Sequence, residues 1–241
     1  MQAPSAEARD AKPASVAPLK VLFIGNSLTF VNDLPSMVEY LSNHASPPLP
    51  IKVDSVTAPG ATLENDWKRG KALEKIRKGG WNYVVLQGQS LECITQQDVF
   101  FRYARLFNAE IRKSGAQTLF YMTWALRHAP QQQAGITAAY EQIGKELGAR
   151  VVPVGVAREK LLKLDVKAPI FRPDGKHPSP QGTYLAACVF HAVLSGRPDA
   201  QLPSVIPNPR NPAKPLVKLD AHDAQLYQKI AGEAVQAGSK R

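Results

Sequence analysis

The feature that most constrains this chain is a short apolar run that ends directly in a polar turn. Val21-Leu22-Phe23-Ile24 leads into Gly25-Asn26-Ser27. A run of this length, rich in β-branched and aromatic residues and bounded by turn residues, predicts a fully buried strand. Residues 34–41 follow as a helical pattern with Pro35 in its first turn. Ser27 therefore comes where open α/β sheets bind ligands, at the carboxyl end of a strand, although serine also shapes many ordinary turns.

The same unit recurs along the chain. Further strands are expected at residues 51–56, 83–86, 118–122 and 151–154, after the first at 19–24. Helices are expected at residues 35–44, 63–78, 97–114, 132–147, 156–164, 181–194 and 221–236. This alternation predicts an α/β fold with a five-stranded parallel sheet covered on both faces. The loops after the first three strands should then meet at one edge of the sheet.

We expect one domain with two unusual ends. Residues 1–18 are rich in Ala, Pro, Ser and charge and predict a disordered tail. Residues 19–195 form the expected domain. Residues 196–241 are expected to belong to the same domain, as a wrapping segment with six prolines between 196 and 215 and a final docking helix. A polar start without an apolar segment fits an exported protein whose signal peptide is absent from this chain.

Composition narrows the classes of partner. The net charge is +10, but basic residues are mixed with acidic ones, as in Arg158-Glu159-Lys160, which is typical of solvated faces rather than of a nucleic-acid site. No apolar run is long enough to span a membrane. Cys93 and Cys188 lack metal-ligand spacing, so no metal site is predicted. Cys188 is expected in the core and Cys93 at the surface, and a disulfide between them is left open.

Ser27 needs a base, and the base needs an orienting acceptor. His177 lies in irregular chain ahead of an apolar helix, with Asp174 three residues before it. In a compact turn this separation lets the carboxylate reach one imidazole nitrogen while the other faces outward. A structural turn capped by Asp174, with an exposed histidine, is the alternative. The other histidines are His44, expected at the surface, His128, expected in a loop, His191, expected within a helix, and His222, near the tail.

These residues carry a resemblance. Gly25-Asn26-Ser27-Leu28 resembles the GDSL block of the SGNH hydrolases, Gly60 matches the glycine of their second block, and Asp174-x-x-His177-Pro178 resembles their D-x-x-H-P block. The resemblance implies a flavodoxin-like three-layer α/β/α sandwich and ester hydrolysis without metal or organic cofactor. It implies Ser27 as nucleophile, His177 as general base and acid, Asp174 as orienting carboxylate, and backbone N–H groups of Ser27 and Gly60 in the oxyanion hole.

The third block departs from the family's usual G-x-N. The string Leu86-Gln87-Gly88-Gln89-Ser90 instead resembles the Q-G-E-S segment of SGNH-type carbohydrate acetylesterases. A glutamine amide supplies the same NH₂ donor as asparagine. We expect Gln87, which directly ends the strand, to complete the oxyanion hole, with Gln89 as the alternative.

The expected substrate is a small ester with a short acyl group, on a carbohydrate or related polyol. Asn26 and Trp124, which follows the fourth strand, are candidates for substrate contacts. Two other readings stay open: a flavodoxin-like module that binds an anion or a flavin at the Ser27 turn, and an inactive SGNH fold that binds carbohydrate.

Overall fold

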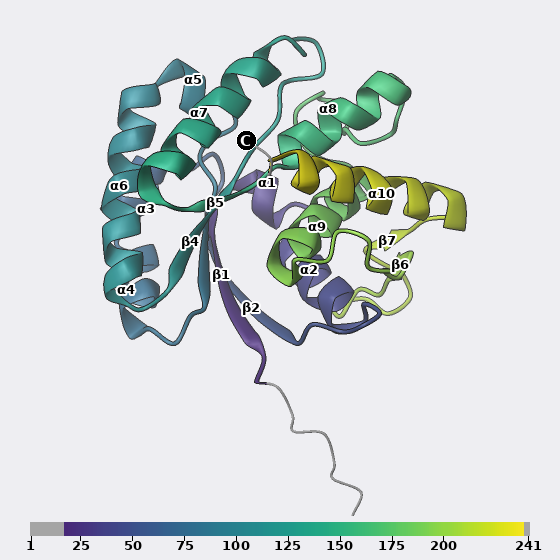
Figure 1. Cartoon of the computed structure of the whole chain (residues 1–241), viewed down its shortest axis with the longest axis horizontal. Helices are drawn as coiled ribbons and strands as arrows, with labels where there is room; N and C mark the ends of the chain where they lie inside the picture. Colours follow the sequence, from purple (N-terminus) through teal and green to yellow (C-terminus); the bar gives the residue numbers. More distant parts are fainter. Residues whose placement is uncertain (1–16, 239–241) are drawn as a thin grey trace, which may run out of the picture.

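A five-stranded parallel sheet lies at the centre of the computed structural model, which describes residues 17–238 (Figure 1). Its strands are β1 (Leu19–Gly25), β2 (Ile51–Thr57), β3 (Tyr83–Leu86), β4 (Gln117–Tyr121) and β5 (Arg150–Val152). Their order across the sheet is β2-β1-β3-β4-β5, and every neighbouring pair is parallel. The predicted fold class is confirmed. Because the chain leaves β1 for β2 on one side and returns to β3 on the other, loops diverge at the carboxyl end of β1, where such sheets bind ligands.

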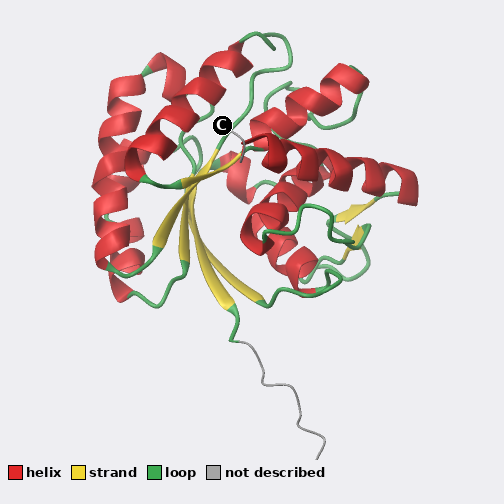
Figure 2. Cartoon of the chain, viewed as in Figure 1, coloured by secondary structure: helices red, strands yellow, loops and turns green. Residues whose placement is uncertain are grey.

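Helices cover both faces of the sheet, as Figure 2 shows. One layer contains α1 (Ser27–Phe30), α2 (Leu34–Asn43), α8 (Val154–Leu164), α9 (Pro180–Ser195) and α10 (Ala221–Gly238). The other contains α3 (Leu63–Arg69), α4 (Lys71–Lys78), α5 (Glu92–Thr95), α6 (Gln97–Lys113) and α7 (Gln132–Leu147).

Strand β1 supplies side chains to both cores. Val21 and Phe23 pack in the core under α2 and α9, whereas Leu22 and Ile24 pack in the core under α3 and α6. All four are fully buried. Because successive side chains of a strand point to opposite faces, a strand between two cores must be apolar at every position. This explains the uninterrupted apolar run.

The structure corrects one predicted helix. The amphipathic pattern over residues 63–78 forms two helices, α3 and α4, because Gly70 adopts φ +76° and caps both. A left-handed residue ends the regular hydrogen-bond ladder, and glycine adopts this conformation without a steric cost. The apolar periodicity continues across Gly70, so it did not reveal the break between the two helices.

The proline-rich segment contains an unexpected hairpin. Strands β6 (Val205–Ile206) and β7 (Val217–Lys218) pair antiparallel, and Ile206 and Val217 are buried in the core next to α2 and α9. Helix α10 packs on α9 and α8. The segment after residue 196 is therefore held by its own apolar side chains. The predicted N-terminal tail lies outside the described residues, apart from residues 17 and 18.

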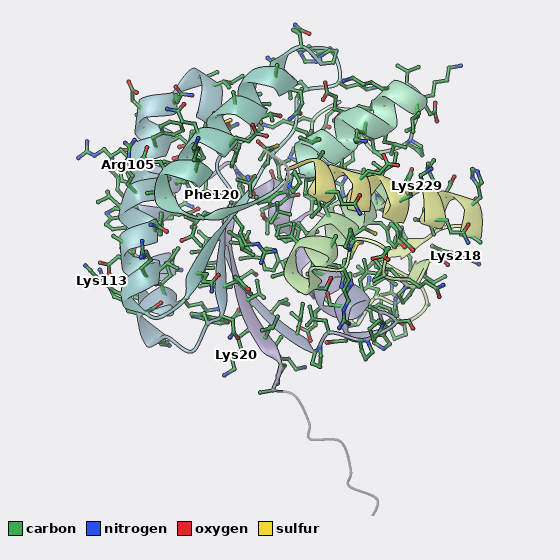
Figure 3. The ribbon with its side chains drawn as sticks, viewed as in Figure 1. Lys20, Arg105, Lys113, Phe120, Lys218 and Lys229 are labelled. Atoms are coloured by element: carbon green, nitrogen blue, oxygen red, sulfur yellow. The ribbon has the colours of Figure 1, made fainter. Side chains whose placement is uncertain are left out.

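Charged side chains are spread over the outside of the molecule. Figure 3 labels one buried aromatic side chain, Phe120, and five exposed cations on four elements: Lys20 on β1, Arg105 and Lys113 on α6, Lys218 on β7 and Lys229 on α10. In residues 17–238 no helix has both the length and the apolar character needed to cross a bilayer.

Both cysteines are buried and neither forms a disulfide. The expectation of a surface position for Cys93 is wrong: it lies on the short helix α5 with its side chain buried in the core, and this burial raises the pKa of the thiol to about 12. The reason is that α5 itself was not anticipated from the sequence.

Substitution of Phe190 tests how much the core beside β1 contributes to stability. Its ring is fully buried, with its centroid 5.2 Å from that of Phe23 and 5.0 Å from that of Tyr121. We expect Phe190→Ala to lower the free energy of unfolding by about 3–5 kcal/mol in urea titrations, because it leaves a cavity. Phe30→Ala is the control, since this ring is 40 % exposed; it should change stability by less than about 0.5 kcal/mol. Equal losses in the two variants would contradict the assignment of the core.

Candidate active site

Ser27 begins the short helix α1, directly after the turn that ends β1. Asn26 caps this helix: its Oδ1 accepts a hydrogen bond from the Leu28 N–H (3.0 Å). Its Nδ2 donates to the carbonyl of Ala61 (2.9 Å), in the loop that carries Gly60. Asn26 is 2 % exposed. The prediction that Asn26 contacts substrate is therefore wrong, because its amide is buried and joins the loops after β1 and β2.

The side chain of Gln87 stabilises the Ser27 turn through hydrogen bonds. Its Oε1 accepts hydrogen bonds from the Asn26 N–H (3.0 Å) and from the Thr29 hydroxyl (2.8 Å). Its Nε2 donates to the carbonyl of Gly88, and the side chain is fully buried. A Cβ at residue 25 would lie 2.6 Å from the Gln87 oxygen, so this close approach requires Gly25. The prediction of Gln87 as an oxyanion donor is wrong, because its amide is used within the frame of the site.

The structure brings together Ser27, His177 and Asp174, the first of which is 150 residues from the second. The Ser27 hydroxyl lies 2.9 Å from Nε2 of His177, and Nδ1 of His177 lies 2.6 Å from Oδ2 of Asp174. Asp174 Oδ1 also accepts from the backbone N–H groups of Lys176 and His177, both at 2.9 Å. With Nδ1–H donated to Asp174, Nε2 is left to accept the Ser27 proton.

The Asp174 carboxyl is ionised at neutral pH. Partial desolvation acts to raise its pKa, but the hydrogen bond from His177 and those from two backbone amides outweigh this effect. Together they lower the pKa of Asp174 to about 2. A carboxylate that keeps its charge fixes the orientation of the imidazole and stabilises its protonated form.

The loop of Asp174 and His177 is fastened to the chain that follows β4. The Arg127 N–H donates to the carbonyl of Gly175 (2.9 Å), and Nε1 of Trp124 donates to the carbonyl of Lys176 (3.0 Å). Trp124 is 2 % exposed, and the guanidinium of Arg158 lies 4.1 Å from its ring centroid. The prediction that Trp124 presents a surface for a sugar is wrong. Its indole supports the histidine loop instead.

Of the four groups predicted as oxyanion donors, all except Gln87 keep an N–H group without a hydrogen-bond partner in the part of the chain that the structure describes. The backbone N–H groups of Ser27 and Gly60 have no hydrogen-bond partner among residues 17–238, and Gly60 lies in an exposed turn with φ +64°. Gln89 is half-buried; its Oε1 accepts from the Leu91 N–H (3.2 Å), and its Nε2 has no partner in the same range. Of the two glutamines, Gln89 therefore keeps its amide donor available.

Two buried carboxyls beneath these loops were not identified from the sequence. Glu92 is 2 % exposed, and its Oε2 accepts from the Gln89 N–H (2.9 Å) while its Oε1 has no partner. Burial raises its pKa to about 7. Asp66, also 2 % exposed, has its pKa raised to about 7 by burial, with Arg69 opposing and Glu92 adding to the shift. Glu92 begins α5, a single turn without apolar periodicity, so no sequence pattern pointed to it.

Outside this site, one group of potential metal ligands among the described residues lies close together. Asp220, His222 and Asp223, at the start of α10, bring their ligand atoms within 4.8 Å of one another. Such exposed acidic groups are common without an ion, and the absence of a metal or cofactor stays a prediction.

Comparison with known proteins adds the family. No protein-family model and no curated protein matches the chain. Among solved structures, a protein assigned to the SGNH hydrolases from Slackia heliotrinireducens aligns over 74 % of this chain and 100 % of its own, with 25 % identity and a TM-score of 0.63. The chain belongs to the SGNH/GDSL hydrolase superfamily.

Two further solved structures, with lower sequence identity, share the fold of this SGNH/GDSL protein. A DUF4886 family protein from Bacteroides uniformis has a TM-score of 0.68 and 18 % identity over 91 % of this chain and 95 % of its own. Axe2, an acetylxylan esterase from Geobacillus stearothermophilus, has a TM-score of 0.57 and 17 % identity over 71 % of this chain and 92 % of its own.

The burial of Glu92 predicts a pH-dependent cost to stability. Its folded-state pKa of about 7 lies above the value of 4.5 for a free side chain. The folded state therefore binds this proton more tightly, and stability falls as pH rises from 4.5 to 7. Such a shift corresponds to about 3 kcal/mol. We expect the stability of Glu92→Gln, measured relative to the wild type by urea unfolding, to rise by up to this amount between pH 4.5 and 8.

Glu146→Gln is the matched control. The hydrogen bond from Arg105 lowers the pKa of Glu146, which stays ionised across this range. Its stability difference from the wild type should be constant above pH 5. A constant difference for Glu92→Gln as well would contradict the raised pKa of Glu92.

Proposed function

We propose that this protein is a serine esterase that hydrolyses short-chain, acetyl-type esters, with a carbohydrate or related polyol as the alcohol. The observation that carries the proposal is the continuous hydrogen-bonded chain from Ser27 through His177 to Asp174 at the carboxyl edge of the sheet. A hydroxyl is a weak nucleophile unless a positioned base takes its proton, and this chain supplies both the base and its orienting carboxylate.

The proposed reaction has two steps. His177 Nε2 takes the Ser27 proton as Oγ attacks the ester carbonyl, and the tetrahedral oxyanion accepts hydrogen bonds from the N–H groups of Ser27 and Gly60 and the amide of Gln89. His177 then gives the proton to the departing alcohol, which leaves an acyl-enzyme. Water, activated by His177, attacks the acyl-enzyme and releases the acid and the free serine. No metal or organic cofactor takes part.

Two observations support the substrate class. The Gln87-Gly88-Gln89-Ser90 segment is similar to the third block of SGNH-type carbohydrate acetylesterases, and an acetylxylan esterase is among the structures that share the fold. The alternative of an anion- or flavin-binding module has less support, because the Ser27 hydroxyl is hydrogen-bonded to His177 and α1 is a single turn of helix.

The triad predicts a common loss of activity. Ser27→Ala, His177→Ala and Asp174→Asn should each lower kcat for 4-nitrophenyl acetate by at least about a thousandfold, and the double variants should lose little more. A fluorophosphonate probe should label Ser27, as mapped by mass spectrometry of the digested protein. Ser36→Ala, in α2, is the control and should keep full activity and labelling. Labelling at another serine, or undiminished turnover by His177→Ala, would overturn the mechanism.

Substitution of the two glutamines should affect different properties of the protein, activity for Gln89 and stability for Gln87. Gln89→Ala should lower kcat by about 10²–10³ because the transition state loses one donor, with little change in the melting temperature. Gln87→Ala should lower the free energy of unfolding by about 1–3 kcal/mol, because it leaves buried polar groups of the Ser27 turn unpaired. Stopped-flow kinetics and thermal unfolding of both variants separate the roles, and a stable, inactive Gln87→Ala beside an active Gln89→Ala would reverse the assignment.

A further inference from the structure

The loop that carries Gln89 is closed by a buried carboxyl. Oε2 of Glu92 accepts a hydrogen bond from the Gln89 N–H (2.9 Å), and the Glu92 N–H donates to the carbonyl of Gln89 (2.8 Å). Oε1 of Gln89 accepts from the Leu91 N–H (3.2 Å). These bonds form a tight turn over residues 89–92. They leave Nε2 of Gln89 as a donor without a partner among residues 17–238.

Two contacts fasten this turn to the rest of the protein. The hydroxyl of Thr123, which follows β4, donates to the carbonyl of Ser90 (2.9 Å). The carboxyl of Glu92 comes close to the backbone at Gly88, where a Cβ would lie 3.1 Å from its Oε2 and 2.8 Å from the ring of Phe100. A side chain at position 88 would therefore push against the ring and the carboxyl. Glycine at this position lets the carboxyl reach the Gln89 N–H.

Glu92 has backbone N–H groups as partners in place of a counter-ion. No cation among residues 17–238 forms an ion pair with it. Burial raises its pKa, and the N–H groups of Gln89 and Leu63 oppose this shift only in part. Leu63 begins α3, three residues after Gly60. The carboxyl thus lies between two of the loops that carry candidate oxyanion donors.

Burial of an ionisable carboxyl is costly, and an apolar side chain would fill the same space without that cost. What the carboxyl adds is an acceptor for the Gln89 N–H. The backbone of Gln89 sets where its amide can reach, and a displacement of about 1 Å in a catalytic group can lower a rate by about 10²-fold. A group that fixes this backbone therefore acts on the transition state through Gln89.

We propose that Glu92 is a positioning residue of the oxyanion hole: its carboxyl fixes the backbone of Gln89, and through it the Nε2 donor that meets the oxyanion. The inference rests on the proposed role of Gln89 in ester hydrolysis. Glu92 itself touches neither the substrate nor the reacting atoms. The position requires an acceptor of this length, so a neutral amide serves as well as the carboxyl.

Three substitutions separate the acceptor from the charge. Glu92→Leu removes the acceptor and should lower kcat for 4-nitrophenyl acetate by about 10–10²-fold, with KM unchanged. Glu92→Gln keeps an acceptor of the same length and should retain the kcat of the wild type. Glu92→Asp is one methylene too short to reach the Gln89 N–H and should lose activity as Glu92→Leu does, which keeps the test valid if the leucine variant does not fold.

A double variant separates positioning from a general loss of structure. Gln89→Ala combined with Glu92→Leu should be no slower than Gln89→Ala alone, because Glu92 acts through Gln89. Thr118→Val is the matched control. It removes a buried hydrogen bond from the Thr118 hydroxyl to Oδ1 of Asn108 (2.7 Å), near the amino end of β4 and away from Ser27, and it should keep the kcat of the wild type.

Amide hydrogen exchange tests the same contact without a substrate. In the ¹⁵N-labelled full-length protein, the Gln89 amide should exchange at least about tenfold faster in Glu92→Leu than in the wild type, because it loses its acceptor. In Glu92→Gln it should exchange at the rate of the wild type.

Three results would overturn the inference and leave the triad untouched. They are wild-type kcat in Glu92→Leu or Glu92→Asp, a loss in the double variant equal to the product of the two single losses, and unchanged exchange of the Gln89 amide in Glu92→Leu. Wild-type kcat in Gln89→Ala would overturn both the role of Gln89 and that of Glu92. Failure of the proposed function itself would be seen differently, as a wild type that neither hydrolyses esters nor is labelled at Ser27, and it would overturn this inference as well.

Discussion

Burial of β1 between two apolar cores fixes the position of the site. Val21 and Phe23 hold the strand against one layer of helices, and Leu22 and Ile24 hold it against the other. Because β1 also pairs with β2 along one edge and with β3 along the other, it is held on all four sides. The turn at Gly25 therefore begins at the end of a rigid strand, and the packing of β1 in the two cores fixes the position of Ser27.

Above this base, buried polar side chains connect the loops. Asn26 joins the loop after β1 to the loop after β2, Gln87 joins the loop after β3 to the loop after β1, and Glu92 holds the backbone of Gln89. Each is nearly or fully buried, so each hydrogen bond is made without competition from water. Most of these polar side chains therefore serve to connect the loops by hydrogen bonds, and they present no surface to a ligand.

This division explains what the sequence predicted and what it did not. The five strands and the layer order follow from apolar runs that alternate with amphipathic helices, and they were predictable because the pattern repeats. Ser27, Asp174 and His177 were predicted as one site because their sequence blocks together resemble those of the SGNH hydrolases, although a serine at a strand end and a D-x-x-H turn are each common. The structure places the three side chains within hydrogen-bonding distance of one another. Asn26, Gln87 and Trp124 were given substrate or oxyanion roles, because residue type does not tell whether an amide or an indole faces a cleft or the backbone beneath it. The break at Gly70 and the carboxyl of Glu92 depend on one backbone angle and one close contact, neither of which produces a periodic signal.

The attachment of the histidine loop has a consequence for how this enzyme fold can vary. The loop is fastened by its backbone carbonyls to the segment after β4, through the N–H of Arg127 and the indole of Trp124. Asp174 and His177, in turn, are held to each other within a single tight turn. A change in the length of the segment after β4 would therefore carry both residues as one body. It would alter their distance from Ser27 and leave their distance from each other unchanged.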